Sequence, residues 1–134
     1  MKKYLVIGNP IQHSLSPLIH NYWLKKYNIS ATYNKEELKN EDLRNLILRV
    51  KKKEIHGINV TVPFKRDVIF YLDKLTVEAE HTQSVNTIYL DDNKTTGHNT
   101  DIDGFKFAIR DIKFDVSKKH VLILGAGGVV PSII

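Results

Sequence analysis

The residues best suited to chemistry lie in a short run at the end of an expected strand. Asn59 and Thr61 alternate with apolar residues in Gly57-Ile-Asn-Val-Thr-Val-Pro-Phe-Lys65, so their side chains share one face of that strand. Lys65 follows where the chain turns, and α/β proteins bind ligands at the carboxyl ends of strands. A lysine there can accept a proton or anchor a carboxylate. The alternative is a surface lysine at a helix start, where the helix dipole mildly disfavours a cation.

Two serines one residue apart form a second candidate site. Ser14 and Ser16 precede Pro17, and the Ser-Pro pair predicts a helix with Ser16 as its N-cap and the proline in its first turn. The free N–H groups of a helix N-terminus attract carboxylates and phosphates, and serine hydroxyls add directed hydrogen bonds. The alternative is that Ser16 only caps the helix and Ser14 only fills the turn.

Two shorter motifs contain further polar side chains. Asn86 lies in Ser84-Val-Asn-Thr87 at the entry to an expected strand, and alone this motif is typical of a turn. Asp101, in Asn99-Thr-Asp-Ile-Asp-Gly-Phe105, can cap the helix that follows it. A capping carboxylate can also bind a hydroxyl or pair with a lysine. The six histidines show no metal-ligand spacing, so no metal site is expected.

Strands and helices that would position these residues alternate along the chain. The patterns predict strands at Tyr4–Ile7, Ala31–Glu36 and Ile58–Val62, and a hairpin of Val85–Leu90 with Thr95–His98. They predict helices at Ser16–Tyr27, Asn40–Lys53, Lys65–Leu72 and Asp101–Ile112, and a helical turn at Glu78–His81. This alternation predicts an α/β fold over residues 1–112, a mixed sheet with helices on both faces.

Residues 113–134 have the pattern of a linker followed by the start of a second domain. Ser117-Lys-Lys119 is polar, and His120–Leu124 is an apolar run expected to form a strand. A glycine loop follows this run, as in a dinucleotide-binding fingerprint. Val130 occupies the third small position of that fingerprint, which would loosen close helix–strand packing. The expected cofactor-binding residues are Gly125, Ala126, Gly127, Gly128 and Val129.

Composition and charge disfavour a nucleic-acid-binding protein and a membrane-spanning protein. The 134 residues have 20 Lys and Arg against 15 Asp and Glu, a net charge of +5, and the lysines are densest at Lys51–Lys53, where they solvate a helix end. No aromatic residues interleave with the basic ones, which disfavours nucleic-acid binding. The chain has no cysteine, which is consistent with a cytoplasmic protein. No apolar stretch approaches the roughly 20 residues of a membrane helix.

Taken in order, four motifs resemble those of the shikimate dehydrogenase family. They are Asn-Pro-Ile-x-His-Ser-x-Ser-Pro, Asn-Val-Thr-Val-Pro-Phe-Lys, Val-Asn-Thr and Asn-Thr-Asp-x-x-Gly-Phe, and together they span the chain. The resemblance implies an oxidoreductase of aromatic amino acid biosynthesis that interconverts 3-dehydroshikimate and shikimate with NADP(H). It also implies a substrate-binding domain followed by the truncated start of a Rossmann domain. One departure is Gln83-Ser84, where the family usually has Gly-Ala.

The same resemblance implies a role for each candidate residue. Ser14 and Ser16 would bind the substrate carboxylate, while Lys65 would be the catalytic lysine with Asp101 as its partner. The residues expected to bind the ring hydroxyls are Asn59, Thr61, Asn86 and Asp101. The implied partners are shikimate and 3-dehydroshikimate rather than a nucleic acid or a membrane, and a homodimer is left open.

Two alternatives stay open at this stage. One is a quinate/shikimate dehydrogenase with broader substrate use, and the other is a stand-alone module that binds a polyhydroxylated acid. The chain stops at Ile134, inside the helix that the glycine loop would open. We therefore expect substrate binding without turnover or NADPH binding. We also expect residues from about Ser117 onward to be poorly ordered, borrowed by a neighbouring chain or packed non-natively.

Overall fold

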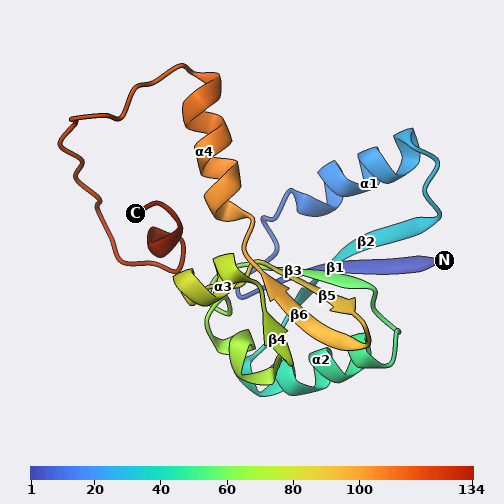
Figure 1. Ribbon diagram of the computed structural model, residues 1–134. Coiled ribbons are helices and arrows are strands. Elements are labelled where there is room, and N and C mark those ends of the chain that lie inside the picture. The colour runs from blue at the N-terminus through green and yellow to red at the C-terminus, as the bar shows by residue number, and fades with distance from the viewer.

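The computed structural model describes residues 1–134 and contains a six-stranded mixed sheet (Figure 1). The strands are β1 (Lys2–Gly8), β2 (Ala31–Glu37), β3 (Gly57–Val60), β4 (Lys74–Leu75), β5 (Thr87–Asp91) and β6 (Lys94–His98). Their order is β2-β1-β3-β5-β6-β4. Neighbours in β2-β1-β3 are parallel, and so is the β6-β4 pair, whereas β5 is antiparallel to both β3 and β6.

Helices cover both faces of this sheet, which confirms the predicted fold class. The α-helices are α1 (Ser16–Lys26), α2 (Leu43–Lys51), α3 (Val77–Thr82) and α4 (Asp101–Asp111). Three short 3-10 helices are η1 (Asn40–Asp42), η2 (Asp67–Tyr71) and η3 (Val130–Ser132). Figure 1 shows α1 on one side of the sheet and α2 on the other. No helix is both long enough and apolar enough to cross a membrane.

The main core lies between the sheet and α2. Leu5 and Ile7 of β1 join this core, whereas Val6, between them, packs with Tyr33 and with Leu24 of α1 on the opposite face. Successive side chains of a strand point to opposite faces, so one strand serves both layers. α2 buries one apolar stripe at helical spacing, as its sequence predicts: Leu43, Leu46, Ile47 and Val50.

Three local predictions are wrong. The segment Lys65–Leu72 forms only the 3-10 helix η2, because the Lys65 carbonyl accepts a hydrogen bond from the Val85 N–H at 2.8 Å rather than opening an α-helix. Ser16 is not the N-cap of α1: Leu15 occupies that position and provides no side-chain cap. The two-residue strand β4 was not expected, since it is too short to show an alternating pattern.

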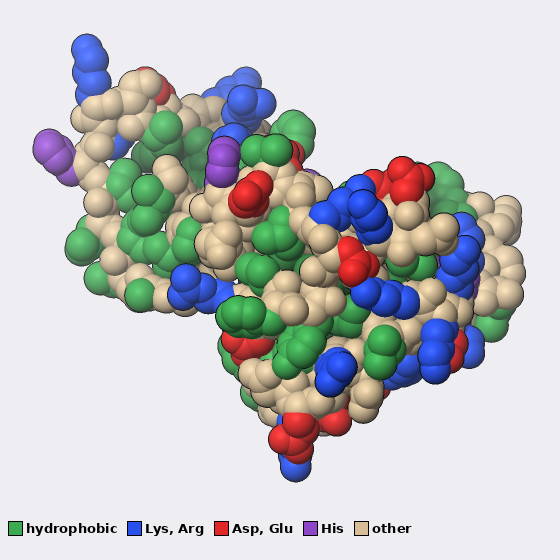
Figure 2. Space-filling model, turned by 60° about the horizontal axis from the view of Figure 1, so that its bottom comes forward, with side chains coloured by type: hydrophobic (Ala, Val, Ile, Leu, Met, Phe, Trp, Pro, Cys, Tyr) green, Lys and Arg blue, Asp and Glu red, His purple; other side chains and the backbone are tan.

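The segment after α4 also departs from its pattern. His120–Leu124 forms no strand, and its side chains are largely exposed, with Leu122 83% exposed. A strand is stable only when a neighbour pairs with it, and no strand of this sheet lies beside the segment. Figure 2 shows the resulting group of exposed hydrophobic side chains on the projecting part at the left.

The packing of α2 gives a test of the core. Leu46 is 1% exposed, whereas Leu48 on the same helix is 45% exposed. We expect Leu46→Ala to lower the free energy of unfolding by about 2–5 kcal/mol, because it removes buried contacts and leaves a cavity. Leu48→Ala is the matched control and should change it by about 0.5 kcal/mol or less. Urea unfolding measures both, and equal losses would contradict this placement of α2.

Candidate functional site

A cluster of polar side chains lies at the C-terminal end of β3. Because β5 runs antiparallel to β3, its first residue, Thr87, lies opposite Asn59. The Val60 N–H donates to the Asn86 carbonyl at 2.8 Å, and the Asn86 N–H donates to the carbonyl of His98 at the end of β6 at 3.0 Å. The ends of β3 and β6 and the start of β5 therefore meet at one edge of the sheet.

An ion pair between Lys65 and Asp101 lies within this cluster. Lys65 Nζ donates to Asp101 Oδ2 at 2.6 Å, and the two side chains are only 14% and 24% exposed. Asn86 Nδ2 donates to Asp101 Oδ1 at 2.9 Å and to Thr100 Oγ1 at 2.8 Å. Both carboxylate oxygens of Asp101 are thus bonded, which fixes the carboxylate against the lysine.

The prediction that Asp101 caps α4 is wrong. Asp101 is the first helical residue, and Thr100 at the N-cap makes no side-chain capping bond. The Asp101 N–H donates instead to Asn99 Oδ1 at 2.8 Å. This arrangement leaves the carboxylate free to pair with Lys65. An ammonium group has three donors, and Asp101 is the only protein acceptor of Lys65 Nζ, so the remaining N–H groups are available to a ligand.

The serine loop lies close to the end of β3 because of a close approach at Gly8. A Cβ atom on Gly8 would lie 2.7 Å from Thr61 Cγ2 and 3.0 Å from the Val62 carbonyl oxygen, so a larger residue would push the loop away. The Asn9 N–H donates to the same Val62 carbonyl at 3.0 Å. The hydroxyl of Thr61 is bonded to no other protein group and is half-buried at this edge.

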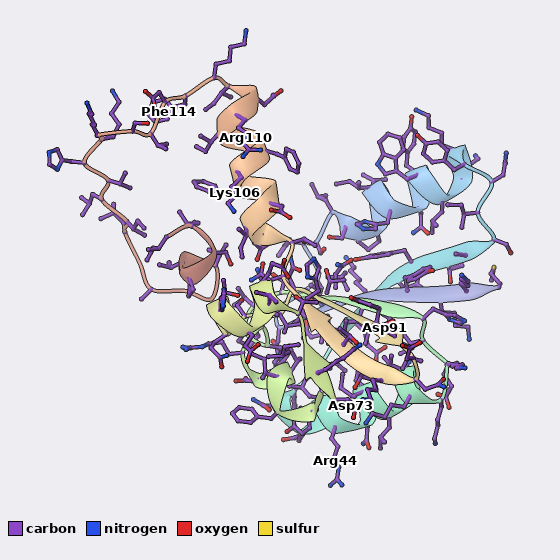
Figure 3. The ribbon with its side chains drawn as sticks, in the orientation of Figure 1. Arg44, Asp73, Asp91, Lys106, Arg110 and Phe114 are labelled. Carbon is purple, nitrogen blue, oxygen red and sulfur yellow. The ribbon has the colours of Figure 1, made fainter.

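Ser14 and Ser16 are both half-buried at the start of α1. Ser14 Oγ accepts a hydrogen bond from the Ser16 N–H at 3.3 Å, so Ser14 takes the role that a capping side chain would have. Figure 1 shows that α1 and α4 both begin near the centre of the molecule and then diverge. Lys106 and Arg110, labelled in Figure 3, lie on the part of α4 that stands away from the sheet.

Tyr33 is a residue that the sequence analysis missed. It lies on β2, is buried, and donates its hydroxyl to Asn59 Oδ1 at 2.7 Å. Burial raises the pKa of Tyr33 to about 12, and the neighbouring Ser16 side chain opposes this rise. The hydroxyl therefore keeps its proton at neutral pH and acts as a donor. No motif marked Tyr33, because it occupies an ordinary apolar position of a strand.

Asn99 is a second missed residue, and it is fully buried. Its Nδ2 lies within hydrogen-bonding distance of Thr82 Oγ1 at 3.0 Å, the Ser84 carbonyl at 3.0 Å and Ser132 Oγ at 2.9 Å. Its Oδ1 accepts from the Asp101 N–H, so Asn99 joins the start of α4 to the C-terminal segment. The signal available in the sequence was its place in the Asn-Thr-Asp motif.

The glycine loop lies beside the ion pair. A Cβ on Gly128 would be 3.6 Å from Lys65 Cβ, and the Gly128 carbonyl accepts a hydrogen bond from Ser84 Oγ at 2.8 Å. Gly125 has φ of 115°, a backbone conformation that favours glycine. No strand precedes this loop, and only the three-residue η3 follows it. These residues alone therefore do not form the strand–loop–helix unit that holds a pyrophosphate.

An apolar groove of about 570 Å³ adjoins the polar cluster between α1 and the strands β3 and β5. It shares Tyr33, Asn59 and Thr87 with the cluster, whereas neither Lys65 nor Asp101 lines it. The groove therefore adjoins the Lys65–Asp101 ion pair without containing it. The charged groups suited to acid–base chemistry lie outside it.

Comparison with known proteins shows the family to which the chain belongs. Residues 6–88 match the model of the shikimate dehydrogenase substrate binding domain. The chain belongs to this family. It is 58% identical over 99% of its length to a shikimate dehydrogenase (NADP(+)) of Pelagibacter ubique, of which it covers 50%. It superimposes on a shikimate dehydrogenase of Peptoclostridium difficile with a TM-score of 0.93 at 36% identity, covering 99% of this chain and 51% of that one.

A second solved structure contains a ligand. The shikimate 5-dehydrogenase of Thermus thermophilus in complex with shikimate matches with a TM-score of 0.90 at 31% identity, over 99% of this chain and 51% of that one. The chain spans about half the length of the curated relatives it matches. The resemblance to shikimate dehydrogenases is thus confirmed for the substrate-binding domain.

The contact from Ser84 to Gly128 can be tested directly. We expect Ser84→Ala to accelerate amide hydrogen exchange of Val130 and Ser132 about two- to tenfold, because the lost hydrogen bond contributes about 0.5–1.5 kcal/mol to holding this segment. Mass spectrometry of exchanged peptides measures the effect. Ser117→Ala, at an exposed position before the loop, is the control. Equal exchange in the two variants would show that the bond does not hold the glycine loop.

Proposed function

We propose that this chain is the substrate-binding part of an NADP-dependent shikimate dehydrogenase. The observation that carries the proposal is the Lys65–Asp101 ion pair, set among polar side chains at the end of β3 in a chain of this family. The names of the relatives support the reaction, the reversible reduction of 3-dehydroshikimate to shikimate.

The polar cluster supplies donors and acceptors for a ring with several hydroxyls. We assign the carboxylate of shikimate to Ser14 and Ser16, at the start of α1, where backbone N–H groups and the helix dipole also favour an anion. The ring hydroxyls are assigned to Asn59, Thr61, Asn86 and Asp101. Support comes from the half-buried positions of these side chains at one edge of the sheet.

Lys65 and Asp101 are assigned the proton transfer. Oxidising a secondary alcohol requires loss of the hydroxyl proton, and a nicotinamide supplies the hydride chemistry when it is bound. As a neutral amine, Lys65 takes the hydroxyl proton on oxidation and becomes the ammonium group that pairs with Asp101; on reduction this ammonium group returns the proton. Asp101 holds the ammonium group through Oδ2, and Asn86 keeps the carboxylate from rotating by bonding Oδ1.

NADP is proposed as the cofactor because the relatives are named for it. Gly125, Ala126, Gly127, Gly128 and Val129 are the residues of this chain assigned to it. We expect no NADPH binding by residues 1–134 alone, since no strand and α-helix frame this loop. A cytoplasmic location and a homodimer stay predictions, and the exposed apolar side chains of α1, among them Leu18 and Tyr22, would suit a contact between subunits.

The assignment of Lys65 predicts a loss of rate. In a dehydrogenase that contains this domain, Lys65→Ala should lower kcat by roughly 10²–10⁴-fold, the usual contribution of a general acid–base group, and should change shikimate affinity far less. Lys53→Ala, at an exposed position away from the cluster, is the control. Steady-state kinetics with near-normal kcat and a raised KM would make Lys65 an anchor instead. The values of kcat/KM for shikimate and for quinate would show whether the enzyme is a shikimate dehydrogenase or a quinate/shikimate dehydrogenase with broader substrate use.

The assignment of the serines predicts a ligand-specific loss of binding. Titration calorimetry of the chain should detect shikimate binding, and Ser14→Ala or Ser16→Ala should weaken it by about 1.5–3 kcal/mol, the contribution of a hydrogen bond to a charged group. A shikimate analogue without the carboxylate should bind each variant as it binds the unaltered chain. Equal losses for both ligands would return the serines to a purely local role in the turn.

A further inference from the structure

A continuous chain of hydrogen bonds runs from Tyr33 to the ion pair. Tyr33 donates to Asn59, Asn59 Nδ2 donates to Thr87 Oγ1 at 3.3 Å, and Thr87 Oγ1 donates to Asn86 Oδ1 at 2.9 Å. Asn86 then donates to Asp101 Oδ1, whose other oxygen accepts from Lys65. Every link points the same way, toward the carboxylate, so Tyr33 is the first donor of this chain.

Tyr33 is held in place by three side chains of α1. Asn21 Nδ2 donates to the Tyr33 carbonyl at 2.7 Å, and Asn21 Oδ1 accepts from the Tyr33 N–H at 3.0 Å. The ring of His20 stacks on the Tyr33 ring with 4.1 Å between centroids and 25° between planes. The Ser16 side chain neighbours the phenol group itself. With its backbone and ring fixed, the Tyr33 hydroxyl lies between the Ser16 side chain and Asn59, and it donates to Asn59.

The hydroxyl of Tyr33 determines the orientation of the Asn59 amide. A side-chain amide can be turned by 180° to exchange its oxygen and nitrogen, and the hydrogen-bond partners decide between the two orientations. Tyr33 satisfies Oδ1 as an acceptor, which directs Nδ2 toward Thr87 and toward the Asn86 carbonyl at 3.4 Å. One lone pair of Asn59 Oδ1 is then left for a hydroxyl of the ligand.

We infer that Tyr33 is a positioning residue of the substrate site, which fixes Asn59 so that it accepts a hydrogen bond from a ring hydroxyl. The inference rests on the proposed function, because shikimate is the ligand whose hydroxyl Asn59 would meet. Tyr33 does not touch the reacting atoms. It acts through Asn59 and joins the end of the site that holds the carboxylate to the end that holds the ion pair.

A double-mutant cycle on shikimate binding tests this inference. Tyr33→Phe keeps the ring and removes only the hydroxyl, so its Kd for shikimate should rise about tenfold, the equivalent of one hydrogen bond. Asn59→Ala should weaken binding at least as much. The double variant should bind within about twofold of Asn59→Ala alone, since two residues that act through one contact are not additive. Calorimetry on the chain measures all four Kd values.

Tyr4→Phe is the matched control, because Tyr4 is partly buried and lines the same groove but its hydroxyl bonds no protein group. It should bind shikimate as the unaltered chain does. Equal Kd values for Tyr33→Phe and the unaltered chain would overturn the inference. So would a double variant whose loss equals the product of the two single losses, which indicates a general structural role.

A second measurement keeps the inference testable without shikimate. In NMR spectra of the chain, the side-chain amide resonances of Asn59 should shift and exchange faster with solvent in Tyr33→Phe and stay unchanged in Tyr4→Phe. An unaltered chain that binds no shikimate would overturn the proposed function. If the Asn59 side-chain amide resonances are the same in Tyr33→Phe and in the unaltered chain, the positioning role is overturned, whatever the result for shikimate binding.

Discussion

The site depends on one feature of the sheet, the reversal of strand direction between β3 and β5. β2, β1 and β3 run parallel, so their C-terminal ends share an edge, and the antiparallel β5 begins at that same edge. This brings Asn86 beside the end of β3 and returns β6 to the same place, where α4 starts with Asp101. Lys65 and Asp101, 36 residues apart, meet for this reason. A parallel β5 would place Asn86 at the opposite edge.

The ion pair needs the polar groups around it. Two partly buried charges lose hydration, and their attraction offsets this cost only when their other hydrogen-bonding positions are also satisfied. Asn86 meets this need for Asp101, and Thr87 and Asn59 orient Asn86 in turn. Lys65 is the exception, because Asp101 is its one protein partner. An ammonium group left with spare donors in a half-buried position is suited to a ligand that brings its own oxygens.

The sequence predicted most helices and strands and the charged residues of the site, but not the residue Tyr33 that orients Asn59. Periodicity located α2 and the hairpin, and the resemblance to the shikimate dehydrogenase family grouped Lys65, Asn86 and Asp101 in one site. Tyr33 could not be found this way, because its role arises from β2 pairing with β1 and from α1 packing above it. The strand expected at His120–Leu124 failed for a related reason: local apolarity predicts a strand, but pairing requires a neighbour that local sequence does not specify.

The segment after Ser117 lacks strands, yet part of it is attached to the site. Asn99 supports the N–H of Asp101 with its oxygen and reaches Ser132 with its nitrogen, while Ser84 holds the Gly128 carbonyl beside Lys65. Residues 128–132 make these contacts, and the expectation of poor order or non-native packing after about Ser117 stays a prediction. The Gln83-Ser84 departure from the family pattern is one source of this attachment, because an alanine at position 84 has no hydroxyl to donate. Asn99 and Ser84 thus connect the start of α4, where Asp101 lies, with the glycine loop and η3.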